Sequence, residues 1–288
     1  MKKTIAAIIV ILIVVSVVVI YQFKDNSLTK LQEANTIRIG YSIEAPFSFV
    51  EPDGSITGLA TMEARVITKR LGIKNIQWRL VEFGSLISEL EADKIDVIAA
   101  GMYITKERAQ RVRFSDPTFH VKLGLAVAKG NPKKLCSYEQ LLATKELKIA
   151  VLAGSIEETL LVKIGFTPDR LISVPDVKSG KIAVATCMAD ALAVALPTLR
   201  WMISNDETNL IEIAKNFKQP ELAIKEKQGY GAFQFRKKDK QLQDAWNEEL
   251  KTFIGSTEQL EIYNRFGFSK EELPNEMTTE MILNQDQN

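Results

Sequence analysis

The chain has 288 residues, of which 46% are hydrophobic and 25% charged, and its formal net charge is +1. This composition is that of a folded protein long enough for two lobes, and it excludes a disordered, collagen-like or polytopic membrane chain. The near-neutral charge gives no electrostatic reason to expect nucleic acid as a partner. The sequence has a single histidine, His120, and two cysteines, Cys136 and Cys187, without a C-x-x-C spacing. We therefore expect neither a metal nor another cofactor, and we interpret the cysteines as small buried residues, although an oxidising compartment would let them pair.

The N-terminal segment, residues 1–25, contains an apolar run from Thr4 to Phe23 that has no charged residue. A helix of that length is roughly 30 Å long, which matches the hydrocarbon core of a bilayer. The small residues of a signal-peptide cleavage site are missing after Ser16, so we expect an uncleaved anchor rather than a cleaved signal. Lys2 and Lys3 favour a cytoplasmic N-terminus, which places the rest of the chain outside the cytoplasm under either interpretation.

The first part of the exported chain alternates between strand and helix patterns. Strands are expected at 37–41, 76–83 and 95–100, and helices at 59–71 and at 85–92, with Ser85 as the cap of the second helix. The run 95–100 is almost wholly apolar, which is typical of a strand buried on both faces of a parallel sheet. This alternation predicts α/β architecture.

A turn signal at 130–132 begins a second block. It contains extended segments at 148–151, 171–174 and 191–196, a helix that begins near Gly154 and Ser155, and a helix over 177–188. The chain then returns through a strand at 229–235 to helices at 240–254 and 257–266. Two such blocks joined by short crossings would place a cleft between them, where small ligands bind.

Six short motifs follow one another in order along the chain. They are Glu44-Ala45-Pro46-Phe47, Asp53-Gly54-x-x-x-Gly58, Glu82-Phe83-Gly84-Ser85-Leu86-Ile87, Asp96-Val97-Ile98-Ala99-Ala100-Gly101-Met102, Thr105-x-Glu107-Arg108 and Phe114-Ser115-Asp116-Pro117. Together they make the chain resemble, from about Thr36 to Phe268, the bacterial extracellular solute-binding proteins of family 3, the receptors of polar-amino-acid ABC importers. Within that family the likeness is greatest to ectoine- and hydroxyectoine-binding receptors, to which Tyr103, Tyr230-Gly231-Ala232-Phe233 and Phe266-Gly267-Phe268 also contribute.

The resemblance implies a two-lobed periplasmic-binding-protein-like α/β fold, with a two-strand hinge that closes on ligand. The N-terminal hydrophobic helix, residues 1–25, would precede it. Lobe 1 is expected to comprise 36–127 with 231–288, and lobe 2 to comprise 128–230. The resemblance also implies an ABC permease as partner, and we expect a monomeric receptor, which the apolar N-terminal segment would attach to the membrane.

The resemblance assigns ligand-binding roles to six residues. Arg108 matches the family's carboxylate-binding arginine, and a guanidinium offers two parallel donors to a carboxylate. Phe47, Phe83 and Tyr103 fall where ectoine receptors have an aromatic box, which would attract a diffuse cation. Glu44 falls where those receptors have an acidic partner, and Ser155 begins a helix whose N–H groups suit a carboxylate. A solvated arginine and glutamate, ordinary aromatic packing and a plain capping box of Ser155 with Glu158 remain the structural alternatives.

One departure from the family pattern bears on the ligand. Family members that bind α-amino acids usually carry an Asp that faces the ligand ammonium, and here that position is Ala195. We therefore expect a zwitterion with a delocalised or substituted cation, with ectoine and hydroxyectoine as the leading ligands. The alternatives are a receptor for ordinary polar amino acids and an enzyme similar to the cyclohexadienyl dehydratases. No nucleophile–base pair, metal set or facing carboxylate pair is evident in the sequence, so no catalytic residue is predicted.

Overall fold

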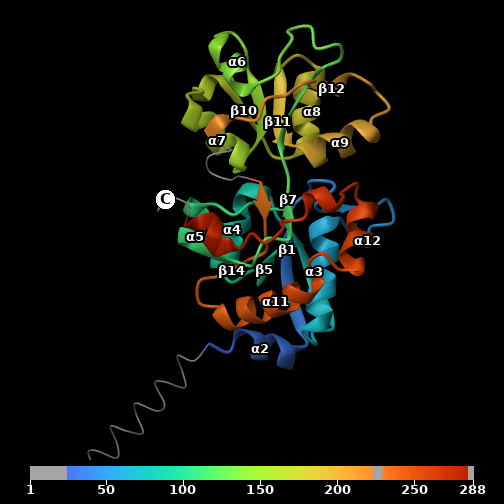
Figure 1. Cartoon of the computed structure of the whole chain (residues 1–288), viewed down its shortest axis with the longest axis vertical. Coiled ribbons are helices and arrows are strands. Elements are labelled where there is room, and N and C mark those ends of the chain that lie inside the picture. The colour runs from blue at the N-terminus through green and yellow to red at the C-terminus, as the bar shows by residue number, and fades with distance from the viewer. Residues whose placement is uncertain (1–24, 223–228, 285–288) are drawn as a thin grey trace, which may run out of the picture.

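The structure is a computed structural model that describes residues 25–222 and 229–284. Two α/β lobes lie one above the other, and extended segments of the chain connect them (Figure 1). The predicted anchor lies almost entirely outside the described residues. Within the described ranges no helix is both long and apolar enough to cross a membrane.

Lobe 1 is organised around a five-stranded sheet. Its strands are β1 (Thr36–Tyr41), β4 (Asn75–Leu80), β5 (Val97–Ile98), β6 (Val112–Phe114) and β14 (Gln234–Arg236), and their order is β4-β1-β5-β14-β6. β1 runs parallel to β4 and β5, whereas β14 runs antiparallel to β5 and β6. A separate hairpin joins β2 (Phe49–Val50) to β3 (Ile56–Thr57).

Helices from both ends of the chain cover this sheet. They are α2 (Ser27–Ala34), α3 (Leu59–Arg70), α4 (Leu86–Glu91), α5 (Lys106–Arg111), α11 (Lys240–Phe253), α12 (Thr257–Arg265) and α13 (Thr279–Leu283), with short 3-10 turns η1 (Phe83–Ser85) and η3 (Lys270–Glu272). α11 packs on α2 and α3, and its Trp246 is fully buried against Phe233 and Phe235. The C-terminal part of the chain therefore completes the core of lobe 1.

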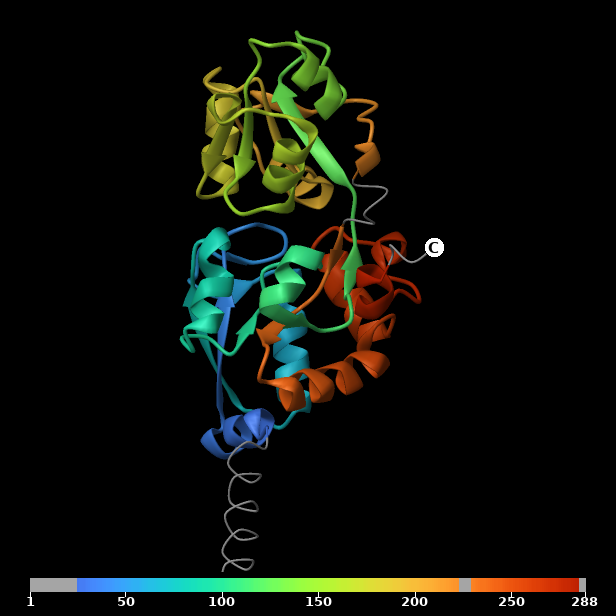
Figure 2. The same cartoon turned by 90° about the vertical axis from the view of Figure 1, so that its left-hand side faces the viewer.

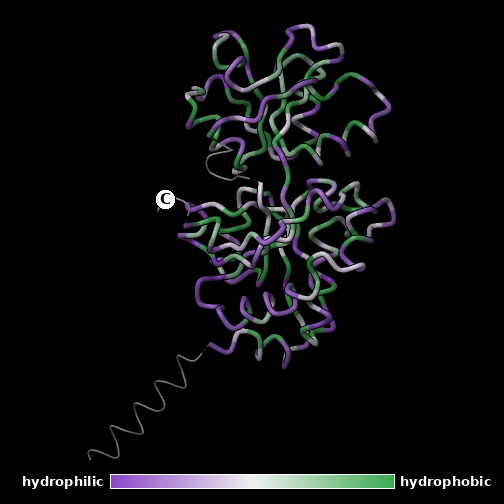
Figure 3. The backbone as a smooth tube through the Cα atoms, in the orientation of Figure 1, coloured by the Kyte–Doolittle hydropathy of each residue, from purple (hydrophilic) through white to green (hydrophobic). Residues whose placement is uncertain are grey.

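Lobe 2 contains the second five-stranded sheet. Its strands are β8 (Leu123–Ala128), β9 (Ile149–Leu152), β10 (Leu171–Val174), β11 (Ala191–Ala195) and β12 (Ile211–Ile213), in the order β10-β9-β11-β8-β12. β9 and β11 are completely buried, as expected for apolar strands covered on both faces. The helices are α6 (Tyr138–Ala143), α7 (Ile156–Ile164), α8 (Val177–Ala185) and α9 (Leu196–Ser204), with the 3-10 turn η2 (Pro168–Arg170). In both lobes the apolar segments run through the middle, and the outer loops are mainly hydrophilic (Figure 3).

The connection between the lobes is built from β7 (Phe119–His120) and β13 (Tyr230–Gly231), which pair antiparallel. From β7 the chain passes directly into β8 of lobe 2 (Figure 2). The His120 and Tyr230 rings stack at 4.1 Å between centroids, so the half-buried His120 has a structural place in this connection. Since β8 pairs in the second sheet from Leu123 onward, we propose that the first lobe boundary lies at 121–122 rather than at 127.

The predicted α/β architecture is confirmed, but the sequence analysis missed whole elements, among them β8, α6 and α9, and other elements differ from the prediction at their ends. The 95–100 run is buried, but only Val97–Ile98 forms ladder pairs, and the predicted 229–235 strand is two short strands. Ser85 occupies the N-cap position of α4, as predicted, but its side chain accepts no capping hydrogen bond. Both cysteines are free thiols, and Cys187 is exposed rather than buried.

Candidate functional site

The six predicted site residues line one cavity between the lobes. This cavity is bounded by Glu44, Phe47, Phe83, Gly101, Tyr103 and Arg108 from lobe 1 and by Leu152, Ser155, Ile156, Glu157 and Val194 from lobe 2. The volume of this cavity is only about 20 Å³, because the side chains of the two lobes nearly fill it. The lobes are therefore closed tightly around these side chains.

Local structure explains how lobe 1 presents its residues. The turn that begins at Glu44 is closed by hydrogen bonds from the Glu44 N–H to the Ser48 carbonyl (2.8 Å) and from the Phe47 N–H to the Glu44 carbonyl (2.9 Å). Arg108 lies in the first turn of α5, where its N–H donates to the capping Oγ1 of Thr105 at 3.1 Å. Tyr103 forms an isolated bridge with Gly231, so it is fixed beside the connection between the lobes.

Arg108 reaches from lobe 1 to lobe 2. Its Nη1 donates to the Tyr103 carbonyl (2.8 Å), its Nη2 donates to the Gly154 carbonyl (2.9 Å), and its guanidinium carbon lies 5.8 Å from the centroid of the Phe83 ring. Burial lowers the pKa of Arg108 to about 10, so the group stays cationic at neutral pH. These two bonds use two of its five N–H groups and leave donors for a carboxylate.

Two buried carboxyl groups share the cavity with Arg108. Glu44 is 7% exposed, and its Oε1 accepts a hydrogen bond from Thr198 Oγ1 at 2.9 Å, while Glu157, in the first turn of α7, is 4% exposed. Burial, and next the charge of Glu157, raises the pKa of Glu44 to about 8, and burial raises the pKa of Glu157 to about 7. The positive charge of Arg108 lowers both pKa values, but by less than burial raises them. When both carboxyl groups are ionised, the cavity holds more negative than positive charge and can accept a cation.

Glu157 is the charged residue in the wall of this cavity that the sequence analysis did not predict. The Ser155-Ile156-Glu157-Glu158 segment resembles a capping box, and Ser155 Oγ does accept from the Glu158 N–H at 3.2 Å. In a capping box the Glu158 carboxylate would accept from the N–H of the capping residue Ser155. Here it accepts from the Gly154 N–H at 2.7 Å instead. Ala195 is buried at the end of β11 and is not among the cavity-lining residues, whereas its neighbour Val194 is.

The aromatic residues combine a cavity face with core packing. The Phe47 ring lies 4.9 Å from the Phe119 ring and 5.6 Å from the Phe268 ring, so it is part of the core as well as of the cavity wall. Gly101, at φ +68°, gives this ring room, because a Cβ there would lie 2.6 Å from it. The Tyr103 hydroxyl is buried and has no hydrogen-bond partner within the described residues. It is therefore available to a polar ligand atom.

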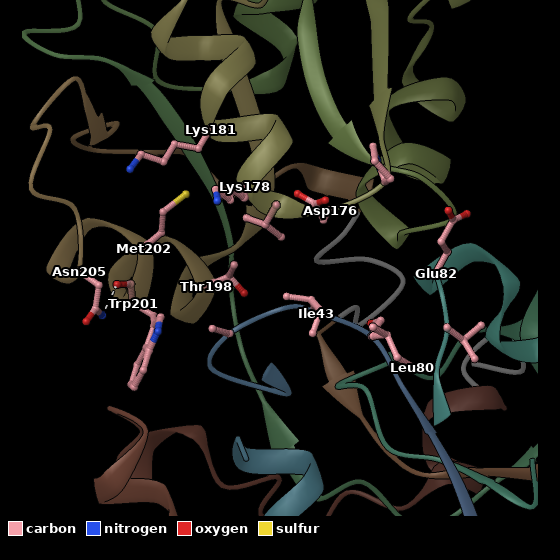
Figure 4. A pocket seen from close by; sticks show the side chains of 15 residues that line it. Ile43, Leu80, Glu82, Asp176, Lys178, Lys181, Thr198, Trp201, Met202 and Asn205 are labelled. Atoms are coloured by element: carbon pink, nitrogen blue, oxygen red, sulfur yellow. Dashed lines mark hydrogen bonds between the residues drawn. The ribbon is translucent and has the colours of Figure 1, made fainter. Parts of the chain in front are cut away.

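A larger groove lies next to this cavity, also between the lobes (Figure 4). Its volume is about 740 Å³, and Ile43 and Leu80 of lobe 1 face Trp201 and Met202 of α9 across it. Thr198 lines the groove and donates to Glu44, which lines the smaller cavity. The Glu44–Thr198 pair therefore belongs to the wall that separates the two spaces.

Comparison with known proteins supports the same interpretation of the fold. The profile of the bacterial extracellular solute-binding proteins, family 3, matches residues 37–270. A probable amino-acid ABC transporter periplasmic-binding protein, y4tE of Sinorhizobium fredii, is 33% identical over 263 residues, which cover 90% of this chain and 86% of that protein.

Two solved structures extend the comparison. The crystal structure of EhuB in complex with hydroxyectoine has a TM-score of 0.81 at 31% identity and covers 90% of this chain and 98% of that one. An ancestral amino-acid-binding protein described as a precursor of cyclohexadienyl dehydratase has a TM-score of 0.73 at 24% identity, covers 84% of this chain and 99% of that one, and shows the fold alone. Because the family profile spans most of the sequence, the chain belongs to the bacterial extracellular solute-binding proteins of family 3.

Proposed function

We propose that this protein is the extracytoplasmic substrate-binding receptor of an ABC importer, and that its ligand is a compact zwitterion of the ectoine and hydroxyectoine type. Family membership and the ABC-transporter relative support the receptor role. The similarity to EhuB, whose structure contains hydroxyectoine, supports this ligand class.

The observation that carries the proposal is the content of one closed cavity: a guanidinium, two carboxyl groups and three aromatic rings. Arg108 would pair with the ligand's carboxylate through its remaining N–H groups. Glu44 and Glu157 would hold the positive end, with the faces of Phe47, Phe83 and Tyr103 around it.

Charge balance explains why a zwitterion suits this cavity. With both carboxyl groups ionised, Arg108 alone leaves one uncompensated negative charge, and a buried unpaired charge is costly. A ligand cation between Glu44 and Glu157 compensates that charge, while the ligand's own carboxylate restores a partner for Arg108. The unpartnered hydroxyl of Tyr103 can donate to a ligand oxygen.

Polar α-amino acids are the second candidate ligands, and Glu157 is the observation that favours them. The expectation of an ectoine-like cation was based partly on the alanine at position 195, but Glu157 places a second carboxyl group in the cavity. A primary ammonium could pair with it. We place amino acids second because three aromatic rings replace the water or amide groups that would satisfy a strongly hydrated ammonium.

An enzyme on the same fold is a further candidate, because Glu44 and Glu157 have pKa values near neutrality, as proton-transfer groups do. The test is simple: proton NMR after long incubation of the protein with bound ligand. Unchanged ligand supports a receptor, and conversion to a new compound supports an enzyme.

We propose that the two lobes lie outside the cytoplasmic membrane as a monomer, that residues 1–25 anchor them, and that a permease receives the ligand from both lobes. The intact mass of the native protein would show whether the N-terminal segment is retained.

The ligand class is tested by thermal-shift screening, followed by calorimetry, with full-length protein and with a shortened protein that begins at Asn26. Ectoine, hydroxyectoine, glutamine, arginine and histidine form the panel. A ligand present at 100 times its Kd stabilises the folded state by about 2.7 kcal/mol, which is easily measured.

A further inference from the structure

We propose that Thr198 is a positioning residue that couples recognition of the ligand's cation to closure of the two lobes. This inference rests on the proposed function, because it concerns how the cavity carboxylate responds to a cationic ligand. Thr198 lies in the first turn of α9 on lobe 2, and Glu44 lies on lobe 1. The Thr198 Oγ1 donates to Glu44 Oε1 at 2.9 Å, and both residues are buried.

This contact differs from the ion pairs that also join the lobes. Lys163–Glu107 (3.0 Å) and Arg200–Glu272 (3.2 Å) each have at least one half-exposed side chain, and such pairs contribute little to stability. The bond from Thr198 is shielded from solvent and ends on a carboxyl group that lines the ligand cavity. Its strength therefore depends on what the cavity contains.

The coupling follows from the charge of Glu44. Two charged groups from the surrounding elements act on it: the carboxyl group of Glu157 in α7 raises its pKa, and the guanidinium of Arg108 in α5 lowers it. The hydroxyl of Tyr103 also faces it, and Glu44 in turn helps to raise the pKa of Tyr103. Burial and the negative charge of Glu157 favour the neutral acid, whereas a cation in the cavity favours the carboxylate. A hydrogen bond to an ionised acceptor is roughly twice as strong as one to a neutral acceptor. A cationic ligand therefore strengthens a bond that exists only while the lobes are closed, and closure in turn favours the cation.

The position of Thr198 makes the hydroxyl group important rather than the volume of the side chain. It lies between Ile43 of lobe 1 and the other α9 residues that face the groove (Figure 4). Valine in its place would keep the shape of this wall but remove the donor. The closed form would then contain a buried carboxylate oxygen that has lost its partner, which is costly for an ionised group.

The test compares Thr198→Val, Thr198→Ser and Arg200→Gln in the full-length protein. Arg200→Gln is the matched control, since it removes an inter-lobe contact from the same helix without touching the cavity. Calorimetry with ectoine between pH 6 and pH 9 gives the affinity, and small-angle X-ray scattering with and without ectoine gives the degree of closure.

We expect Thr198→Val to weaken ectoine binding by about tenfold or more and to reduce ectoine-induced closure. We also expect it to shift the rise of affinity with pH toward higher pH, since Glu44 loses a group that favours its ionised form. Thr198→Ser should retain nearly wild-type affinity, and Arg200→Gln should lose less than about threefold.

Equal affinities and pH profiles for wild type and Thr198→Val would overturn the coupling, as would an equal loss in Arg200→Gln. In those cases wild-type binding of ectoine would still stand. If wild type itself does not bind ectoine, both this inference and the proposed ligand class fail.

Discussion

Gly84 of lobe 1 and Gly154 of lobe 2 touch across the cleft. A Cβ atom on Gly154 would lie 2.6 Å from the Cα of Gly84. The two backbones can therefore approach each other this closely only because neither residue has a side chain. Gly154 also supplies the carbonyl that accepts from Arg108, which places the contact directly beside the cavity.

We predict that Gly154→Ala weakens ligand binding at least tenfold, because the methyl group holds the lobes apart. Its backbone at φ +74° adds strain, since L-residues rarely adopt this conformation. Gly130→Ala is the matched control: it has φ +78° but no atom within 4 Å of its Cβ position. Both variants should lose a similar amount of thermal stability, and Gly130→Ala should keep its affinity in calorimetry. Equal affinities for the two variants would show that the glycine contact does not govern closure.

We predict that Arg108→Ala abolishes measurable binding while the protein still folds. The lost guanidinium leaves the ligand carboxylate without its partner, which costs about 2–5 kcal/mol for a buried charge pair. Arg111→Ala is the control on the same helix, because Arg111 pairs with the exposed Glu91. Circular dichroism checks the fold and calorimetry the affinity. Unchanged affinity in Arg108→Ala would remove this residue from the site.

Ligand affinity should fall as the pH falls from about 8 to 6. The pKa values of Glu44 and Glu157 are raised to about 8 and about 7 in the closed cavity, and the ligand cation binds the ionised forms. Protons therefore compete with the cation at lower pH, and binding at pH 7 should release protons. Calorimetry in two buffers with different ionisation enthalpies counts these protons. A flat pH profile without proton release would contradict the assignment of both carboxyl groups to the cation.

A buried carboxyl group outside the cavity makes a prediction about stability. Glu63 is fully buried, accepts from Gln259 Nε2 at 2.8 Å, and has its pKa raised from 4.5 to about 8 by burial. Between those two values the unfolded chain loses the proton while the folded chain keeps it, so stability falls as pH rises.

Glu63→Gln should therefore stabilise the protein at pH 7 by up to roughly 3 kcal/mol, since each pKa unit corresponds to about 1.4 kcal/mol. Thermal melts at pH 5 and pH 8 would show that the loss of stability between these two pH values is smaller in the variant than in wild type. Glu44 and Glu157, whose pKa values are also raised, account for the loss that remains in the variant. The exposed Glu280→Gln should leave the difference unchanged. A destabilised Glu63→Gln at pH 8 would refute this account.

The sequence predicted most of the architecture because burial leaves a clear pattern. The extended segments predicted at 148–151 and 191–196 form β9 and β11, two central strands of lobe 2. The ends of strands were less predictable. The run 95–100 is buried throughout, but only Val97 and Ile98 pair with neighbouring strands. Such pairing depends on strands that are distant in the sequence, so the run itself does not reveal it.

The cavity residues that lie within family motifs could be predicted from the sequence. Cavity residues outside such motifs could not, because they look like ordinary helix residues. Arg108 and the aromatic residues fell within recognisable motifs. Glu157 looked like an ordinary acidic residue in the first turn of a helix, and only the closed arrangement of the lobes brings it to the cavity. The partnership of Glu44 with Thr198 spans 154 positions, so no local pattern could indicate it.

The most direct test of the central claim is the ranking of ligand affinities by calorimetry on wild-type protein. We predict that ectoine and hydroxyectoine bind at least tenfold more tightly than glutamine, arginine and histidine, a difference of about 1.4 kcal/mol. Phe83→Ala should weaken the preferred ligand most, because it removes one face of the aromatic wall. Tight binding of an amino acid without detectable binding of either ectoine would contradict the account, and the three aromatic rings would then be ordinary packing.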